Sequence, residues 1–324
     1  MGTALASLVA GTGRSVRIWV YEPELVAQIN TEHVNGMFLP DLRLPDTLVA
    51  TGSLEEALAG AGLVISVTPS QVMRQVWSSG REHLAPDAVV VCASKGVETG
   101  TTMLMSEVLE EVLPGRDPGR LAFLSGPSFA KEIVAGQPTA VVVASRDEEV
   151  AALVQKTVST EKFRAYTTDD VVGVELGGAL KNVIAIAVGV SEGMGLGLNS
   201  RSALITRGLA EISRLAVACG ANPLTLAGLA GVGDLVLTCT GHLSRNLQVG
   251  IRLGEGETLT EILDSMKMVA EGVETSRSAM ELAGRKGVEM PISQVVARLL
   301  EGEVRPEEAV AELMSRRLRS EKEF

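Results

Sequence analysis

Short runs rich in β-branched residues alternate with longer amphipathic segments through the first half of this 324-residue chain. This alternation is typical of a parallel sheet that helices cover on both faces. After about residue 166 the apolar residues recur instead at the helical period, between Gly, Asn and Pro punctuation. The pattern predicts an α/β domain with a doubly wound, mostly parallel sheet over residues 1–168, followed by an all-α domain over residues 169–324. The predicted strands are residues 16–21, 63–68, 88–92, 121–125 and 140–144, and the predicted helices of the second domain are residues 171–192, 201–219, 243–253, 273–286, 293–300 and 306–318.

The charge balance argues against nucleic acid as a partner. Asp and Glu number 40 against 29 Lys and Arg, and no basic run exceeds Arg316-Arg317. A nucleic-acid-binding surface would need clustered positive charge. The longest uncharged apolar run, residues 182–191, is shorter than the roughly 20 residues of a membrane helix, and no basic segment precedes the apolar N-terminus. The sequence therefore predicts a cytoplasmic protein without membrane insertion.

Cysteine and histidine show neither the spacing of a metal site nor that of a disulfide framework. The three cysteines are predicted to be packed, reduced thiols, and the three histidines to be surface or core residues without a metal. They are Cys92, Cys219, Cys239, His33, His83 and His242.

The N-terminal segment predicts that the first strand of the sheet is missing. Gly11-Thr12-Gly13 follows a helical stretch and precedes a strand, so it predicts a helix C-terminal turn and not a phosphate-binding loop, which would have the reverse context. Gly2, by contrast, comes immediately before a helix of small residues, as the last glycine of a dinucleotide-binding loop does. In doubly wound sheets the first strand is central, so its absence would leave two neighbouring strands without a partner.

Polar or glycine-containing turns follow three of the predicted strands. They are Pro69-Ser70-Gln71, Ser94-Lys95-Gly96 and Ser125-Gly126-Pro127-Ser128. Each turn alone would be an ordinary connection between a strand and the next element. The carboxyl ends of parallel strands line one crevice, however, so three such turns indicate a binding site there. In the last turn Gly126 permits close backbone approach, and Ser128 is predicted to cap the following helix.

Glu22 follows the strand predicted over residues 16–21. An acid at this place accepts hydrogen bonds from the ribose hydroxyls of NAD, whereas an arginine accommodates the 2′-phosphate of NADP. Glu22 therefore favours NAD. The alternative is that Glu22 only caps the helix that begins at Pro23.

Lys181 lies on an apolar helix face, with Gly177, Gly178, Ile184 and Ala185 as its neighbours at helical spacing. No acidic residue of this helix pairs with it, so desolvation is expected to lower its pKa. A positioned ammonium group can give its proton to a carbonyl oxygen as hydride reaches the carbon. The alternative is a lysine whose stem packs while its head reaches water.

Two further segments of the second half carry polar groups. Asp234 follows a glycine-rich turn and opens an apolar helix, where it could also be only an N-cap. Ser244-Arg245-Asn246 begins another helix, and the free N–H groups, the helix dipole and a guanidinium there suit a phosphate. The alternative for this tripeptide is capping plus a surface arginine.

Ten motifs along nearly the whole chain resemble the bacterial-type glycerol-3-phosphate dehydrogenase family, which uses NAD or NADP. They are GTALA (2–6), FLP (38–40), PSQ (69–71), SKG (94–96), SGPSFAKE (125–132), ALKNVIAIA (179–187), ALITRGLAE (203–211), GVGDLVLTCT (231–240), SRN (244–246) and VAEG (269–272).

The resemblance implies an oxidoreductase that interconverts dihydroxyacetone phosphate and sn-glycerol 3-phosphate and supplies phospholipid synthesis. It implies that Lys181 is the catalytic proton donor or acceptor. It assigns the substrate to Lys95, Gly126, Ser128, Lys181, Asp234, Ser244, Arg245 and Asn246, and the cofactor to Lys95, Ala130, Arg245, Val269 and Glu271. Tyr21-Glu22 replaces a pair that is commonly basic in the family, which again favours NAD over NADP.

Two other functions stay open at this stage. A related β-hydroxyacid dehydrogenase also joins a dinucleotide domain to a helical domain around a lysine, although Ser244-Arg245-Asn246 favours a phosphorylated substrate. An inactive ligand-binding remnant is the second alternative, if the first strand is truly absent. Small-residue helices of the second domain could pack in a homodimer.

Overall fold

The computed structural model describes residues 1–266, 269–318 and 320–321 of the chain, which divide into two compact units. The first comprises residues 1–68, 72–94 and 106–171, and the second comprises residues 69–71, 95–105 and 172–324. Two short segments from the first half of the chain thus belong to the second unit, a division that the sequence did not indicate.

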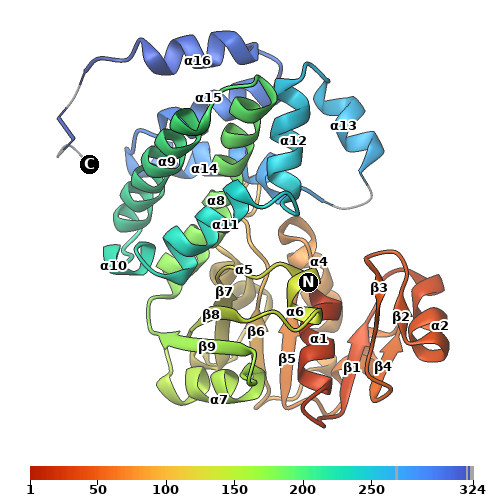
Figure 1. Ribbon diagram of the computed structural model, residues 1–324. Coiled ribbons are helices and arrows are strands. Elements are labelled where there is room, and N and C mark those ends of the chain that lie inside the picture. The colour runs from red at the N-terminus through yellow and green to blue at the C-terminus, as the bar shows by residue number, and fades with distance from the viewer. Residues whose placement is uncertain (267–268, 319, 322–324) are drawn as a thin grey trace. The chain divides into compact units, whose positions relative to one another are not determined.

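The first unit is an α/β structure whose sheet is mostly parallel, as predicted (Figure 1). Five strands pair in the order β5-β6-β7-β8-β9, parallel except for the β7–β8 pair, and β1 and β4 form a separate parallel pair. The strands are β1 (Val16–Trp19), β2 (Val34–Asn35), β3 (Leu39–Arg43), β4 (Leu48–Thr51), β5 (Leu63–Ser66), β6 (Val89–Cys92), β7 (Leu121–Ser125), β8 (Thr139–Ala144) and β9 (Phe163–Thr168). The α-helices are α1 (Gly2–Ala10), α2 (Pro23–Glu32), α3 (Leu54–Leu58), α4 (Met73–Gly80), α5 (Met105–Val112), α6 (Ala130–Val134) and α7 (Glu148–Val158).

The strands of the first unit differ in burial. Every residue of β6 and β7 is buried, which explains their continuous apolar sequences. Most residues of β1 and β5 are only partly buried. Within the described residues each of these two strands has one hydrogen-bonded neighbour, β4 for β1 and β6 for β5. The sheet is therefore divided between β1 and β5, and a first strand lost from this place stays a prediction.

Local sequence explains several element ends in this unit. Asp147 accepts hydrogen bonds from the backbone N–H groups of Glu149 and Val150, so α7 begins there. The turn predicted at residues 11–13 is confirmed: α1 ends at Ala10, and Gly13 has a φ of +84°.

The second unit is helical, as predicted, and a large cluster of buried apolar side chains, many of them from α8, forms its core. Its helices are α8 (Val171–Gly193), α9 (Leu198–Ala218), α10 (Pro223–Leu226), α11 (Asp234–Thr240), α12 (Arg245–Gly254), α13 (Leu259–Ser265), α14 (Glu271–Lys286), α15 (Pro291–Leu300) and α16 (Pro306–Met314), and a π-helical turn spans Leu229–Gly233.

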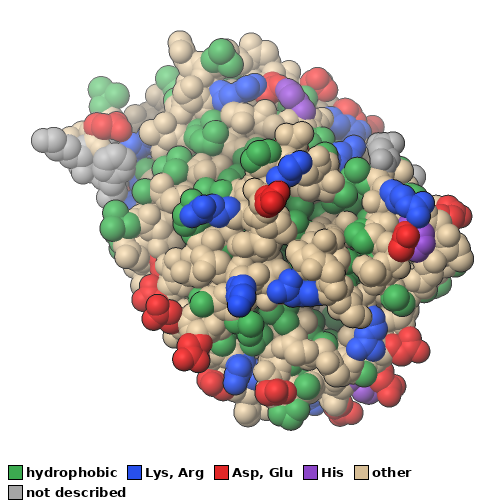
Figure 2. Space-filling model, turned by 60° about the horizontal axis from the view of Figure 1, so that its bottom comes forward, with side chains coloured by type: hydrophobic (Ala, Val, Ile, Leu, Met, Phe, Trp, Pro, Cys, Tyr) green, Lys and Arg blue, Asp and Glu red, His purple; other side chains and the backbone are tan. Residues whose placement is uncertain are grey.

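Two stretches could cross a membrane by length and composition alone, α8 and Pro223–Thr240. Of the most apolar window of α8, 94% is buried in the protein, as in the core helix of a globular unit. The corresponding figure for the second stretch is 39%, and that stretch carries the fully enclosed carboxylate of Asp234. Acidic and basic side chains are interspersed on the face drawn in Figure 2.

A side chain from another helix caps the start of α15. The backbone of Met290 precedes α15 without a side-chain cap, and Pro291 occupies its first turn. The carboxylate of Glu211, on α9, accepts hydrogen bonds from the N–H groups of Ile292 (2.6 Å) and Ser293 (3.1 Å). The Ser293 hydroxyl also donates to it, at 3.1 Å. Glu211 therefore satisfies donors that the helix itself cannot pair.

Candidate active site

Lys181 lies on α8, and its ammonium group is enclosed by the second unit. The residue is 6% exposed. Nζ donates a hydrogen bond to Oγ1 of Thr238 (2.6 Å) and lies 3.0 Å from Oδ1 of Asp234. The alternative of a lysine whose head reaches water is therefore wrong. The expectation of a lysine without a counter-charge is also wrong, because α11 supplies a carboxylate that the sequence of α8 cannot reveal.

Asp234 is the centre of this cluster. Its Oδ2 atom lies 2.6 Å from Nζ of Lys95, so the carboxylate is held between two ammonium groups. The residue is 2% exposed and makes no side-chain cap at the start of α11, so the N-cap alternative is wrong. The π-helical turn before it is tight, since a Cβ on Gly231 would overlap the carbonyl group of Leu226. This turn brings the first residue of α11 into the core.

Thr238 is a member of the cluster that the sequence analysis missed. Its hydroxyl accepts a hydrogen bond from the Lys181 ammonium and donates one to the backbone oxygen of Asp234, at 2.6 Å. Thr238 is 4% exposed. Its spacing of four residues from Asp234 places both on one face of α11, and this was the available signal.

The cluster shifts the pKa values of its members in the direction that suits proton transfer. Burial lowers the pKa of Lys181 to about 8; Asp234 opposes this effect, while the positive charge of Lys95 adds to it. Burial raises the pKa of Asp234, but Lys181 and Lys95 together outweigh burial and hold it below its usual value. The site thus contains a stable carboxylate and a lysine that can exchange its proton near neutral pH.

A second group of predicted residues lies at the starts of α12 and α14. Glu271 accepts hydrogen bonds from the N–H (3.2 Å) and the hydroxyl (2.5 Å) of Ser70, a residue of the turn at 69–71. Burial raises the pKa of Glu271, against the hydrogen bonds from Ser70 and the charge of Arg245. Arg245 is exposed, yet desolvation by the surrounding protein lowers the pKa of its guanidinium, an effect that Glu271 opposes. Val269, predicted for the cofactor, is 48% exposed.

The tripeptide at 244–246 also has a structural role. The Ser244 hydroxyl accepts a hydrogen bond from the Leu247 N–H and caps α12, and the amide oxygen of Asn246 accepts one from the Gly272 N–H at 2.9 Å. The capping alternative and the exposed arginine are thus both observed, and the binding roles of Ser244, Arg245 and Asn246 stay predictions.

Four predicted site residues belong to the first unit. Gly126 has a φ of +126°, and a Cβ there would lie 3.0 Å from Cα of Val141, so other residues would be strained. The Ser128 hydroxyl donates to the Gly126 carbonyl at 2.8 Å, so the prediction that Ser128 caps α6 is wrong. Ala130 is the first residue of α6. Glu22 occupies the N-cap position of α2, as the structural alternative expected, but its side chain makes no capping hydrogen bond.

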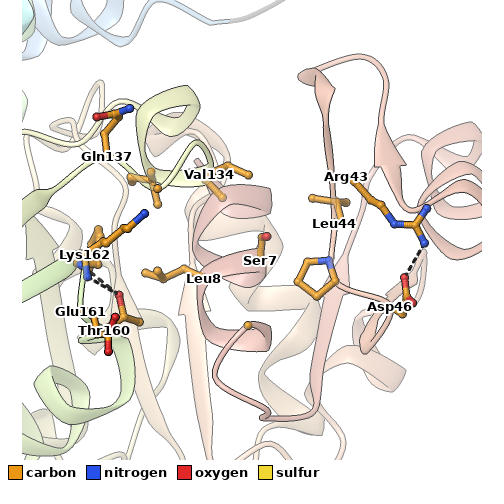
Figure 3. Close-up of a pocket in the computed structure, with 16 residues that line it drawn as sticks. Ser7, Leu8, Arg43, Leu44, Asp46, Val134, Gln137, Thr160, Glu161 and Lys162 are labelled. Carbon is orange, nitrogen blue, oxygen red and sulfur yellow. Dashed lines mark hydrogen bonds and ion pairs between the residues drawn. The ribbon is translucent and has the colours of Figure 1, made fainter.

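A cavity of about 770 Å³ in the first unit lies over the outer face of α1 (Figure 3). Its lining includes Leu8, Lys162 and the ion pair of Arg43 with Asp46, whose side chains are 70% and 72% exposed. None of the predicted site residues lines it, so it is not the candidate site. Among the described residues no group of His, Cys, Asp or Glu could hold a metal ion. Cys92, Cys219 and Cys239 form no disulfide in the described part of the chain, and Cys219 is only partly buried.

A doubly wound unit followed by a helical unit with a buried lysine and carboxylate defines the class of two-domain nicotinamide-dependent dehydrogenases. The family described as NAD-dependent glycerol-3-phosphate dehydrogenase matches the chain in two parts, its N-terminus over residues 1–151 and its C-terminus over residues 170–311. The chain belongs to this family.

Relatives and solved structures agree with this assignment. The chain is 54% identical over 321 residues to glycerol-3-phosphate dehydrogenase [NAD(P)+] of Geobacter metallireducens, covering 99% of the chain and 96% of the relative. It is 52% identical over 320 residues to the protein of the same name from Citrifermentans bemidjiense, with the same coverage. The crystal structure of glycerol-3-phosphate dehydrogenase from Coxiella burnetii superposes with a TM-score of 0.93 at 39% identity, covering 97% of this chain and 95% of that one. D-mandelate dehydrogenase, at 12% identity, shares the fold alone.

Proposed function

We propose that the chain reduces dihydroxyacetone phosphate to sn-glycerol 3-phosphate with a reduced nicotinamide cofactor, and catalyses the reverse oxidation. The observation that carries this proposal is the Lys181–Asp234–Lys95 cluster in a chain of this family. The β-hydroxyacid dehydrogenase alternative gains no support from relatives of such high identity.

The proposed reaction needs one proton and one hydride. A reduced nicotinamide bound to the first unit would supply the hydride for the carbonyl carbon. Lys181 gives a proton from Nζ to the carbonyl oxygen, which becomes the hydroxyl group of the product. Asp234 favours the ammonium form of Lys181, and burial keeps the pKa of that ammonium near 8. In the reverse direction the neutral amine of Lys181 accepts the hydroxyl proton.

The remaining predicted residues would hold the phosphate and hydroxyl groups of the substrate. Lys95 contributes a second positive charge beside Asp234, and Arg245 presents an exposed guanidinium at the start of α12. A guanidinium and a helix N-terminus together suit a phosphate. Gly126, Ser128, Ser244 and Asn246 would contribute close backbone approach and neutral hydrogen bonds.

The first unit has features that fit a dinucleotide. Helix α1 begins at Gly2 without a side-chain cap and without an acidic residue in its first turn, which leaves its N-terminus suited to a pyrophosphate. Glu22 would accept the ribose hydroxyls and favour NAD over NADP. Ala130 in the first unit, and Lys95, Arg245, Val269 and Glu271 in the second, are the other proposed cofactor residues.

The cellular role follows from the proposed activity. Glycerol phosphate produced in the cytoplasm would supply phospholipid synthesis. Small-residue helices of the second unit would support a homodimer, which analytical ultracentrifugation would test.

The experiment for the proposed function is the oxidation of NADH and of NADPH by dihydroxyacetone phosphate. It should use this chain and a version extended at its N-terminus by a glycine-rich strand. Turnover in either form supports the function, and turnover only in the extended form supports the prediction of a missing strand. A preference for NADPH would contradict the role of Glu22, and folded protein without turnover in both forms would favour the inactive remnant.

Arg245→Ala tests the phosphate site. We expect weaker binding of dihydroxyacetone phosphate, by roughly the 2–5 kcal/mol typical of truncating one partner of a desolvated charge pair, with the lower end expected because this arginine is partly exposed. Isothermal titration calorimetry would measure the change. Unchanged affinity would place the phosphate elsewhere.

A further inference from the structure

Helices α8 and α12 both belong to the second unit (Figure 1). Two glycines on each helix form the contact between them. Gly189 and Gly193 are four residues apart on α8, and Gly250 and Gly254 are four residues apart on α12. Residues with this spacing share one face of a helix. Small residues on facing surfaces let two helix backbones approach closely.

The first pair of glycines is in reciprocal contact. A Cβ on Gly250 would overlap the Ile186 carbonyl oxygen and lie 2.8 Å from Cα of Gly189. A Cβ on Gly189 would overlap the Leu247 carbonyl oxygen and lie 2.8 Å from Cα of Gly250. The obstacles are backbone atoms, so no rotation of a side chain could make room for a methyl group.

The second pair repeats the arrangement one turn further along. A Cβ on Gly254 would overlap the Val190 carbonyl oxygen and lie 3.0 Å from Cα of Gly193, while a Cβ on Gly193 would overlap the Ile251 carbonyl oxygen. Residue numbers rise together on the two helices, so the helices run in the same direction. The start of α12 therefore points toward the part of α8 that carries Lys181.

A fifth glycine, Gly272 on α14, lies at the end of the helix pair that is nearer to Lys181. A Cβ on Gly272 would lie 2.7 Å from the carbonyl oxygen of Asn182, the neighbour of Lys181, and 2.8 Å from Oδ1 of Asn246. The Gly272 N–H also donates to that Oδ1 atom. The backbone beside Lys181 and the start of α12 are thus connected through Gly272 and the side chain of Asn246.

We propose that Gly250 is a positioning residue, which sets the separation between the proton-donating Lys181 and the phosphate-binding start of α12. This inference rests on the proposed function. Gly250 is five residues from Arg245, or about 7.5 Å along the helix axis, so a displacement at the glycine is transmitted directly to the arginine.

The expected defect is specific to the phosphate. The partners of Lys181 are Asp234 and Thr238 on α11, and Lys95 supports Asp234. None of these three residues is on α12. A displaced α12 would therefore impair binding of the phosphate while leaving the proton chemistry of Lys181 in place.

The test compares Gly250→Ala with Gly254→Ala and with Gly284→Ala in the full chain, in the N-terminal form that is active. Gly284 is the matched control, because it lies on α14 in the same unit and a Cβ there would meet nothing within 4 Å. For each protein kcat/KM would be measured with dihydroxyacetone phosphate and with dihydroxyacetone, which lacks the phosphate. Calorimetry with sn-glycerol 3-phosphate would give an affinity independent of turnover.

We expect Gly250→Ala to lower the ratio of the two kcat/KM values by roughly 10- to 100-fold, since a misplacement of about 1 Å can cost about 10²-fold in rate. Gly254→Ala should lower the ratio less, because it is one turn further from Arg245. Gly284→Ala should leave it unchanged. The pH at which reduction declines should be the same in all four proteins.

Two results would overturn the proposal. One is an unchanged ratio in folded Gly250→Ala protein, and the other is an equal loss with both substrates, which would indicate general damage. If Gly250→Ala does not fold, the ratio of the two kcat/KM values in Gly254→Ala tests the proposal instead. Failure of the unaltered protein to reduce dihydroxyacetone phosphate would instead reject the proposed function, so the two failures are distinguishable.

Discussion

Asp234 and Glu211 are two carboxylates of the helical unit with the same burial, 2% exposed each, yet their pKa values move in opposite directions. Lys181 and Lys95 hold the pKa of Asp234 below its usual value. Burial raises the pKa of Glu211, although N–H groups of α15 and the Ser293 hydroxyl donate to it. Hydrogen bonds from neutral donors therefore lower the pKa of a buried carboxylate less than two nearby cations do. Asp234 thus raises the pKa of the reactive Lys181, whereas Glu211 caps the start of α15.

The largest effect on turnover is expected from substitution of Lys181, whose pKa Asp234 raises. Lys181→Met should lower turnover by about 10²–10⁴-fold, the usual contribution of a positioned general acid. Steady-state kinetics would measure the loss, and calorimetry with NADH would show whether cofactor affinity is spared. Lys286→Met, at an exposed site of α14, is the control and should retain full turnover. Retention of more than a tenth of the turnover by Lys181→Met would reject its proton-transfer role.

Asp234→Asn should produce the second largest effect, because it removes the buried carboxylate that lies against the ammonium groups of Lys181 and Lys95. We expect turnover to fall about 100-fold at pH 7, since the pKa of Lys181 would drop further, and stability to fall by about 3–5 kcal/mol. Urea denaturation and kinetics on the same preparation would measure both. Normal turnover in a folded variant would show that the lysine does not depend on this carboxylate.

Glu211→Gln makes the equivalent chemical change at the other carboxylate and should affect stability alone. The loss of a strong acceptor from the start of α15 should cost about 1–3 kcal/mol, with kcat unchanged. Since folding raises the pKa of Glu211, its protonation favours the native state at low pH. That contribution is lost as pH rises from about 4.5 through the raised pKa. The variant should lack this pH dependence in urea denaturation, and a large loss of kcat would abolish the distinction between the two carboxylates.

Thr238→Val should have the smallest effect. In the unaltered protein, reduction should decline as pH rises through about 8, where Lys181 loses its proton, and oxidation should increase over the same range. Removal of the hydroxyl that accepts from the ammonium should lower the pKa of Lys181 further, so both transitions should shift to lower pH, with reduction a few-fold slower at pH 7. Thr240→Val is the control, because that exposed hydroxyl bonds only the backbone of its own helix in the described structure. Identical profiles would show that the Thr238 hydroxyl does not affect the pKa of Lys181.

Sequence patterns predicted those helices and strands that a run or a periodic spacing of apolar residues marks within the element itself. The apolar run of α8, the buried valines of β6 and the order of sheet and helical units all follow from periodicity. Strand β9 was missed although its buried and exposed residues alternate, because its sequence FRAYTT contains few large aliphatic residues.

The site was predictable only as separate residues. Lys181 and Asp234 were both identified, but 53 positions separate them, and their pairing depends on the π-helical turn before α11. Composition could not show that residues 69–71 and 95–105 belong to the helical unit, because membership of a compact unit depends on tertiary contacts. Thr238 could have been found from its helical spacing to Asp234.

The passage of residues 95–105 into the helical unit also limits how this protein can be recombined. A fragment that starts at residue 169 would lack Lys95 and leave Asp234 with one of its two cations. No single crossover point separates the sheet unit from the helical unit with the ionic cluster intact. A chimera that keeps the whole helical unit of one parent would need to transfer residues 69–71, 95–105 and 172–324 together, because all three segments belong to that unit.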